Sequence, residues 1–230
     1  MPGKTGFIIS LICTTLLFYG CVGESADKPV HTSSSKAPKS GKINKSIPQT
    51  ISIYRYGDFP IDKAEKLRKR LQDYFPNVVL KERALPLPAK HYNKERNRYR
   101  GTGLYEDLGQ HRNEDVVIGL TNYVIFLAND KSPTFGIMGV SPLGAYKCVV
   151  SSKLPKTGAE HTEDNFRKLA LHELGHAFGL NHCPNQHCYM VDAEHKMKFP
   201  QTTGFCESCS KTLNSKGWKI SVTPNTNMGQ

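Results

Sequence analysis

The chain has 230 residues, of which 38% are hydrophobic and 22% are charged, and its formal net charge is +11. Once a targeting segment is subtracted, this length leaves room for one domain with a full hydrophobic core and excludes a large multi-domain enzyme. The positive charge brings nucleic acid and anionic lipid into consideration as partners.

The N-terminus has the composition of an export signal. Lys4 precedes an apolar run over residues 7–20, which matches the hydrophobic region of a signal peptide and falls short of the ~20 residues of a membrane-spanning helix. The pair Gly20-Cys21 resembles the cleavage and lipidation site of a bacterial lipoprotein. We therefore expect residues 1–20 to be a signal peptide and Cys21 to carry lipid, which would anchor an exported protein on the periplasmic or cell-surface side. Ordinary secretion is the alternative.

Residues 21–49 are rich in Ser, Lys, Gly and Pro, which is typical of a disordered tether. Residues 50–230 form the predicted folded domain, in which strand and helix patterns alternate. The predicted elements are a strand at 50–59, a helix at 61–75, a strand at 77–87, a mixed helix and loop segment at 90–112, a buried strand within 115–128, two further strands at 135–140 and 145–152, and a helix at 165–180. This alternation predicts an α/β domain with a mixed sheet.

The most informative segment, HELGHAFGLNHCPNQHCYM, covers residues 172–190 and has the spacing H-E-x-x-H-x-x-G-x-x-H. His172 and His176 are four residues apart, so on a helix both imidazoles lie on one face. Gly179 lets the chain leave the helix in the left-handed conformation and brings His182 back as a third ligand. Three nitrogen ligands with an open fourth position are typical of a catalytic zinc ion.

Glu173 follows the first of these histidines directly and projects beside the metal without being a ligand. Zinc lowers the pKa of its bound water from 15.7 to roughly 7, and a carboxylate nearby can accept the proton and pass it to a leaving amine. The position of Glu173 therefore predicts a general base and acid.

The residues beyond the third histidine resemble the metzincin clan of zinc peptidases, in which a methionine, here Met190, forms a turn beneath the metal. Within the clan, Cys183, Cys188 and the C-x-x-C pair Cys206 and Cys209 are similar to the archaemetzincin family. The resemblance implies that these four cysteines bind a second, structural zinc ion. It also implies a metzincin-like zincin fold, with a mixed twisted sheet packed on helices that include the active-site helix, and a small C-terminal subdomain.

The two cysteine pairs also suit a closed zinc site by their own spacings, C-x₄-C and C-x₂-C. Disulfides are the alternative in an exported protein, because its compartment is oxidising. Cys148 stands alone on an apolar strand, where we expect a small buried hydrophobe. The resemblance covers roughly residues 50–230 and is strong only over 172–209.

These observations predict a zinc-dependent peptidase that acts as a monomer, binds two zinc ions per chain and cleaves a peptide or protein. By analogy with the clan, the substrate lies antiparallel along an edge strand, with Phe135–Val140 as the expected strand. The alternatives are a catalytically silent, zinc-stabilised peptide-binding protein and a basic zinc-ribbon protein that binds nucleic acid. The intact Glu173 argues against the first. Export and the unexplained histidines argue against the second, so no nucleic acid partner is expected.

Overall fold

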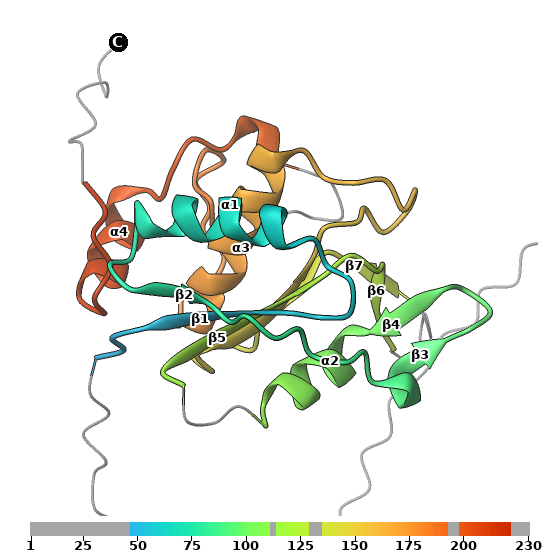
Figure 1. Ribbon diagram of the computed structural model, residues 1–230. Coiled ribbons are helices and arrows are strands. Elements are labelled where there is room, and N and C mark those ends of the chain that lie inside the picture. The colour runs from blue at the N-terminus through green and yellow to red at the C-terminus, as the bar shows by residue number, and fades with distance from the viewer. Residues whose placement is uncertain (1–46, 111–113, 129–134, 193–197, 222–230) are drawn as a thin grey trace, which may run out of the picture. The chain divides into compact units, whose positions relative to one another are not determined.

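The structure is a computed structural model that describes residues 47–110, 114–128, 135–192 and 198–221 (Figure 1). The predicted signal peptide, Cys21 and most of the predicted tether lie outside these residues. The described helices are α1 (Ile61–Gln72), α2 (Gly101–Leu108), α3 (Glu163–Ala177) and α4 (Glu207–Asn214), with short 3₁₀ turns at Ala89–His91 and Phe199–Gln201. None of these helices combines the length and the apolar composition that crossing a membrane requires.

A mixed five-stranded sheet forms the centre of the fold. Its spatial order is β2 (Val78–Leu80), β1 (Ile51–Arg55), β5 (Val116–Thr121), β9 (Lys147–Ser151) and β8 (Gly139–Val140). The first four strands run parallel, and β8 is antiparallel to β9 at one edge. All six residues of β5 are buried, as expected for a central strand covered on both faces. The predicted α/β architecture with a mixed sheet is confirmed.

A second sheet of four strands has the order β3 (Tyr92–Asn93), β4 (Arg98–Arg100), β6 (Ile125–Leu127) and β7 (Phe135–Ile137). Two segments were each predicted as a single strand, but in the structure each forms two strands, one in either sheet. Residues 115–128 form β5 and β6, and residues 135–140 form β7 and β8. The hairpin β3–β4 was not predicted within 90–112. Alternating hydrophobicity shows that a segment is extended, but it does not show which strand each half pairs with.

The central sheet separates two hydrophobic cores. Along β5, Val116, Ile118 and Leu120 face the core beneath α1 and α3, whereas Val117, between the first two, faces the core that includes Leu104 of α2. This alternation has the period of two that a strand imposes on its side chains. Figure 1 shows α1 and α3 on one side of the sheet and α2 on the other. One face of the sheet is therefore shared by α1 and α3, the helix that carries two of the predicted metal ligands.

The chain beyond α3 shares the core of the sheet. Met190, Leu213 and Trp218 are buried in the same cluster as the side chains of α3. The ring of Phe178 lies 5.2 Å from the ring of Trp218 and 5.8 Å from that of Phe75, measured between centroids. The segment predicted as a small C-terminal subdomain is therefore held against the main domain by aromatic packing.

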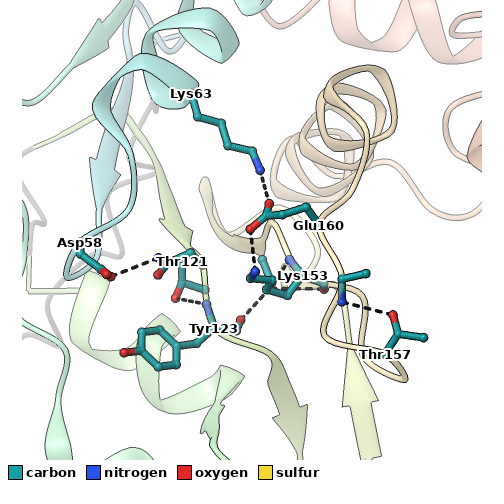
Figure 2. Close-up of polar contacts among 10 residues, drawn as sticks. Asp58, Lys63, Thr121, Tyr123, Lys153, Thr157 and Glu160 are labelled. Atoms are coloured by element: carbon teal, nitrogen blue, oxygen red, sulfur yellow. Dashed lines mark hydrogen bonds and ion pairs between the residues drawn. The ribbon is translucent and has the colours of Figure 1, made fainter.

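A network of polar contacts precedes α3 (Figure 2). The Glu160 carboxylate pairs with Lys153, at 2.9 Å, and with Lys63 of α1. These two cations and their hydrogen bonds lower the pKa of Glu160 to about 2, against the opposing effect of burial. The network ties the start of the α3 segment to α1 and to the end of β9.

His161 follows this network and is buried, with only 5% of its surface exposed. Its main-chain N–H donates to the Ser152 carbonyl, at 2.8 Å, but neither ring nitrogen has a hydrogen-bond partner among the described residues. Burial, and then the positive charge of Lys63, lower the pKa of His161 to about 4. The folded protein therefore favours the neutral imidazole.

This lowered pKa predicts an acid sensitivity that can be measured. The unfolded chain takes up the His161 proton near pH 6.5 and the folded chain only near pH 4, so the free energy of unfolding should fall as the pH falls through this range. The variant His161→Leu should lose that part of the pH dependence. Urea unfolding at a series of pH values compares the two proteins, and parallel curves between pH 6.5 and 4 would contradict the prediction.

Candidate functional site

Helix α3 is anchored at its first turn and buried along most of its length. The Thr162 hydroxyl accepts the main-chain N–H of Asn165, at 3.2 Å, which caps the helix. Glu163 and Asp164 in the first turn interact favourably with the positive end of the helix dipole. The helix begins at Glu163 and ends at Ala177, slightly before the predicted range of 165–180. Nearly every residue from Phe166 to Ala177 is buried, so the helix holds its side chains rigidly.

The C-terminal end of α3 is closed by a glycine turn. Gly179 has φ of +95°, its N–H donates to the His176 carbonyl, and the Leu180 N–H donates to the Gly175 carbonyl. This pair of hydrogen bonds is the Schellman motif, in which glycine takes the left-handed position without strain. Gly179 thus has the left-handed conformation expected from the sequence, and after this turn the ring of His182 lies 4.8 Å from that of His176, between centroids.

Carbonyls at this helix end also accept hydrogen bonds from other parts of the chain. The N–H groups of Gly144 and Tyr146, in the loop between β8 and β9, donate to the carbonyls of His176 and Ala177. The Lys216 ammonium, beyond α4, donates to the Phe178 carbonyl. A cation at a helix C-terminus also interacts favourably with the negative end of the helix dipole. The end of the helix that carries the histidines is therefore fixed from two sides.

The three predicted histidine ligands converge. One ligand atom from each of His172, His176 and His182 lies within 4.8 Å of the others. The Nε2 atoms of His172 and His176 are 3.1 Å apart, and the ring of His182 lies 4.8 Å from that of His176, between centroids. His172 is buried, His176 is partly buried and His182 is exposed. This gradient of exposure leaves the group open to solvent on the His182 side.

Hydrogen bonds on the far side of two rings determine their tautomers. The Nδ1–H of His172 donates to the Tyr189 carbonyl and that of His176 to the Leu180 carbonyl, both at 2.7 Å. Because each carbonyl only accepts, Nδ1 carries the proton and Nε2 keeps a lone pair. Burial lowers the pKa of His172 to about 4 and lowers that of His176, which favours the neutral form. Two lone pairs that face each other across 3.1 Å fit a shared cation, and neutral imidazoles are ligands that zinc prefers.

The third histidine has a carboxylate behind it. The Nδ1 of His182 lies 3.5 Å from the Asp192 carboxylate. A carboxylate in this position fixes the orientation of an imidazole and raises its basicity as a ligand. Each of the three histidines therefore has an oxygen atom close to its Nδ1 atom.

Glu173 is buried between α3 and the edge of the central sheet. Only 8% of its surface is exposed, and burial raises the pKa of its carboxyl group to about 8. A Cβ atom built on Gly139 of β8 would lie 2.5 Å from the carboxyl carbon of Glu173, so the side chain packs directly against the main chain of the strand. The carboxylate thus lies beside the edge strand and on the helix that carries two of the histidines.

The four predicted cysteine ligands form a second cluster. The sulfur atoms of Cys183, Cys188, Cys206 and Cys209 lie within 4.8 Å of one another, and all four are free thiols. The Cys188 sulfur accepts the main-chain N–H groups of Met190 and Cys206, at 3.4 and 3.3 Å. Hydrogen bonds from Cys209 and from these N–H groups lower the pKa of Cys188 to about 5. Burial raises the pKa of Cys183, and the hydrogen bond to Cys188 raises that of Cys209, so Cys188 favours the thiolate form more than these two thiols do. Four converging sulfur atoms fit a closed zinc site.

Met190 lies between the two clusters. It is fully buried, and its sulfur packs on Gly175 of α3, where an added Cβ atom would lie 2.3 Å from that sulfur. Its main-chain carbonyl accepts the Cys183 N–H, at 2.8 Å, and its N–H donates to the Cys188 sulfur. The methionine predicted from the resemblance therefore packs beneath the histidine-bearing turn of α3, and the cysteine cluster holds its main chain.

Several residues of the site were not predicted. Leu180 and Tyr189 act through main-chain carbonyls, which leave no side-chain signature in a sequence, and Asp192 is one carboxylate among many. Arg167 donates to the hydroxyl groups of Tyr189 and Tyr74, both at 3.2 Å, so it holds Tyr189 in place. Two other histidines are near this segment in the sequence. His187 is exposed and bonds to the Gln201 carbonyl, and His195 lies outside the described residues.

Comparisons with known proteins agree with this geometry. A family model described as peptidase family M54 matches residues 61–215. The archaemetzincin of Methanopyrus kandleri is 28% identical over 153 residues, which cover 65% of this chain and 85% of that protein. The archaemetzincin of Methanocaldococcus jannaschii is 26% identical over 182 residues, which cover 75% of this chain and 97% of that protein.

Solved structures show the same fold. The crystal structure of the Methanopyrus kandleri archaemetzincin matches with a TM-score of 0.60 and 23% identity, covering 76% of this chain and 98% of the other. That of the Archaeoglobus fulgidus protein matches with a TM-score of 0.58 and 24% identity, covering 71% and 99%. The family match and the metal-binding side chains that converge on α3 lead to one conclusion: the chain belongs to peptidase family M54, the archaemetzincins, and is a zinc-dependent metallopeptidase.

Proposed function

We propose that His172, His176 and His182 hold the catalytic zinc ion and that Glu173 is the general base and acid of peptide-bond hydrolysis. The observation that carries this proposal is the approach of two unprotonated Nε2 atoms, 3.1 Å apart, on the helix that also bears Glu173. When bound, a zinc ion lowers the pKa of a water molecule from 15.7 to about 7 and polarises the substrate carbonyl group. Three protein ligands leave a fourth tetrahedral position open for this chemistry.

Glu173 performs the proton transfers. Its carboxylate takes a proton from the attacking water and then gives it to the departing amine nitrogen, which restores the starting state of the side chain. Burial raises the pKa of the Glu173 carboxyl group to about 8, which is closer to neutral pH than that of an exposed carboxyl group, as proton transfer in both directions requires. Its contact with Gly139 and the rigidity of α3 limit the positions that the carboxylate can occupy.

The substrate strand pairs with β8. This strand is the last in the central sheet among the described residues and is antiparallel to β9, so a peptide can extend the sheet by main-chain hydrogen bonds. The sequence indicates Phe135–Val140 as the strand that pairs with substrate. Because β7 belongs to the second sheet, only Gly139–Val140 of this segment lies at the edge of the central sheet. Glu173 packs against the same short strand, so a peptide paired there would lie beside the base.

The four-cysteine cluster holds the second zinc ion and has a structural role. Its four sulfur atoms fill a tetrahedral set of ligands, which leaves no position for substrate. Among the described residues between α3 and α4, the 3₁₀ turn Phe199–Gln201 is the only helix or strand, so cross-linking through the four cysteines restrains the segment that carries His182 and Met190. The adjacent positions of His182 and Cys183 couple the two metal sites.

The N-terminal segment adds a proposal about location. Residues 1–20 act as a signal peptide, Cys21 carries lipid, and residues 21–49 tether a monomeric peptidase domain, residues 50–230, to a membrane on its periplasmic or cell-surface side. The apolar run before Gly20-Cys21 supports this proposal. Mass spectrometry of the mature N-terminus tests it, since an acylated Cys21 is expected and an unmodified or uncleaved N-terminus would overturn it.

The variant Glu173→Gln should separate metal binding from turnover. It keeps the size of the side chain but removes the proton acceptor, so kcat should fall roughly 10²-fold or more while two zinc ions per chain remain. Cleavage of a peptide library by the domain, with zinc measured by elemental analysis, tests both points. The control Glu160→Gln changes a carboxylate outside the site and should keep wild-type kcat. Full activity of Glu173→Gln would refute the assigned mechanism.

The variant Cys183→Ser should affect both metal sites. It should lose the zinc ion of the cysteine cluster and also weaken the catalytic site, because Cys183 adjoins His182 and its N–H binds the Met190 carbonyl. We expect about one zinc ion per chain or fewer and at least tenfold lower affinity for the remaining ion, measured by competition with a chelator. The control Cys148→Ala removes a thiol outside the cluster and should keep two ions. A Cys183→Ser protein with wild-type zinc content and activity would show that the sites are independent.

A further inference from the structure

The hydrogen-bond pattern of β8 shows which way its main-chain groups point. Gly139 lies opposite Val150 of β9, and the Ser151 N–H donates to the Met138 carbonyl, at 2.8 Å. In an antiparallel pair this pattern makes Gly139 and Val150 a non-hydrogen-bonded pair. The N–H and C=O of Gly139 therefore point away from β9, toward the edge of the sheet at which an added strand would pair.

The two faces of β8 also differ at this point. A Cβ atom built on Gly101 of α2 would lie 3.6 Å from a methyl group of Val140, so the Val140 side chain faces α2. Successive residues of a strand face opposite sides, so the Cα of Gly139 faces α3. A Cβ atom built on Gly139 would lie 2.5 Å from the Cγ, the carboxyl carbon and the Oε1 atom of Glu173. Atoms cannot approach so closely, so any side chain at position 139 must displace the carboxylate or the strand.

Neither partner in this contact is free to move far. Glu173 is fixed on α3, whose C-terminal carbonyls are bound by the loop after β8 and by Lys216. Gly139 is fixed by the pairing of β8 with β9. The contact therefore sets the distance between the base and the main-chain groups that face the open edge.

We propose that Gly139 is a positioning residue that sets the register of the substrate. The substrate residue that pairs with the N–H and C=O of Gly139 adjoins the scissile bond, because Glu173 packs against that same glycine. Position 139 has no side chain because the carboxylate occupies the space where a Cβ atom would be. This inference rests on the proposed peptidase function and deepens it, since it names the point on β8 at which the bond is cleaved.

A thermal-unfolding cycle tests the contact without any measurement of activity. Gly139→Ala should lower Tm by roughly 4 °C, as overpacking of a buried contact does in a domain of this size. In the background of Glu173→Ala, which removes the atoms that a methyl group would meet, the same substitution should change Tm by less than about 1 °C. All four proteins are compared at the same zinc concentration. An equal drop in both backgrounds would overturn the proposed contact.

The control Gly204→Ala adds a methyl group at a glycine where a Cβ atom meets nothing within 4 Å and φ is not positive. Its Tm should match that of the wild type. If Gly139→Ala alone does not fold, folding of the double variant with Glu173→Ala supports the contact. Failure of both proteins to fold contradicts it.

Two measurements on active protein test the register. Gly139→Ala should keep two zinc ions and a KM within about threefold of the wild type, while kcat falls at least tenfold, because a small displacement of a base is costly. In a peptide that the wild type cleaves, N-methylation should reduce kcat/KM at least tenfold at a residue adjoining the scissile bond. If N-methylation lowered kcat/KM only at residues remote from the scissile bond, the proposed pairing of the substrate with Gly139 would be wrong. If the wild type cleaves no peptide, the proposed function fails. The thermal-unfolding cycle still shows whether Gly139 and Glu173 are in contact.

Discussion

Two hydrogen bonds from histidine rings to main-chain carbonyls are the constraint on which the rest of the site depends. The Nδ1–H groups of His172 and His176 donate to the carbonyls of Tyr189 and Leu180, so the Nε2 atoms keep lone pairs that face each other across 3.1 Å. Such an arrangement is unfavourable without a cation between the two atoms. The carbonyls must therefore be held accurately, and the Schellman turn at Gly179 holds one of them. The other belongs to Tyr189, whose side chain is bound by Arg167.

The second carbonyl connects the histidines to the cysteine cluster. Tyr189 lies between Cys188 and Met190, and both neighbours take part in the hydrogen bonds around the sulfur atoms. The segment from His182 to Met190 thus carries a histidine ligand, two cysteines, the carbonyl that orients His172 and the methionine that packs on Gly175. This segment has no helix or strand of its own, so metal binding at the two proposed sites would supply the order that secondary structure supplies elsewhere.

The sequence was informative where function requires particular side chains. Ligand chemistry demands histidine and cysteine at fixed spacings, so the members of both side-chain clusters that the structure brings together were predicted by residue number. The sequence was less informative where function requires only main-chain atoms. Tyr189 and Leu180 contribute carbonyl oxygens that every residue has, and Gly139 reads as an ordinary glycine in an extended segment. The division of 115–128 and 135–140 between two sheets was also not predicted, since strand pairing depends on contacts distant in sequence.

Three glycines around α3 show how the site achieves its compactness. Gly139 lets the Glu173 carboxylate reach the edge strand, Gly175 lets the Met190 sulfur reach the helix, and Gly179 lets the chain turn back with His182. In each case an absent side chain allows a functional group to approach more closely than packing otherwise permits. The histidines and Glu173 determine which chemistry is possible, and these glycines determine the distances at which it takes place. Both are needed, because catalysis by a fixed base depends on the position of that base as strongly as on its identity.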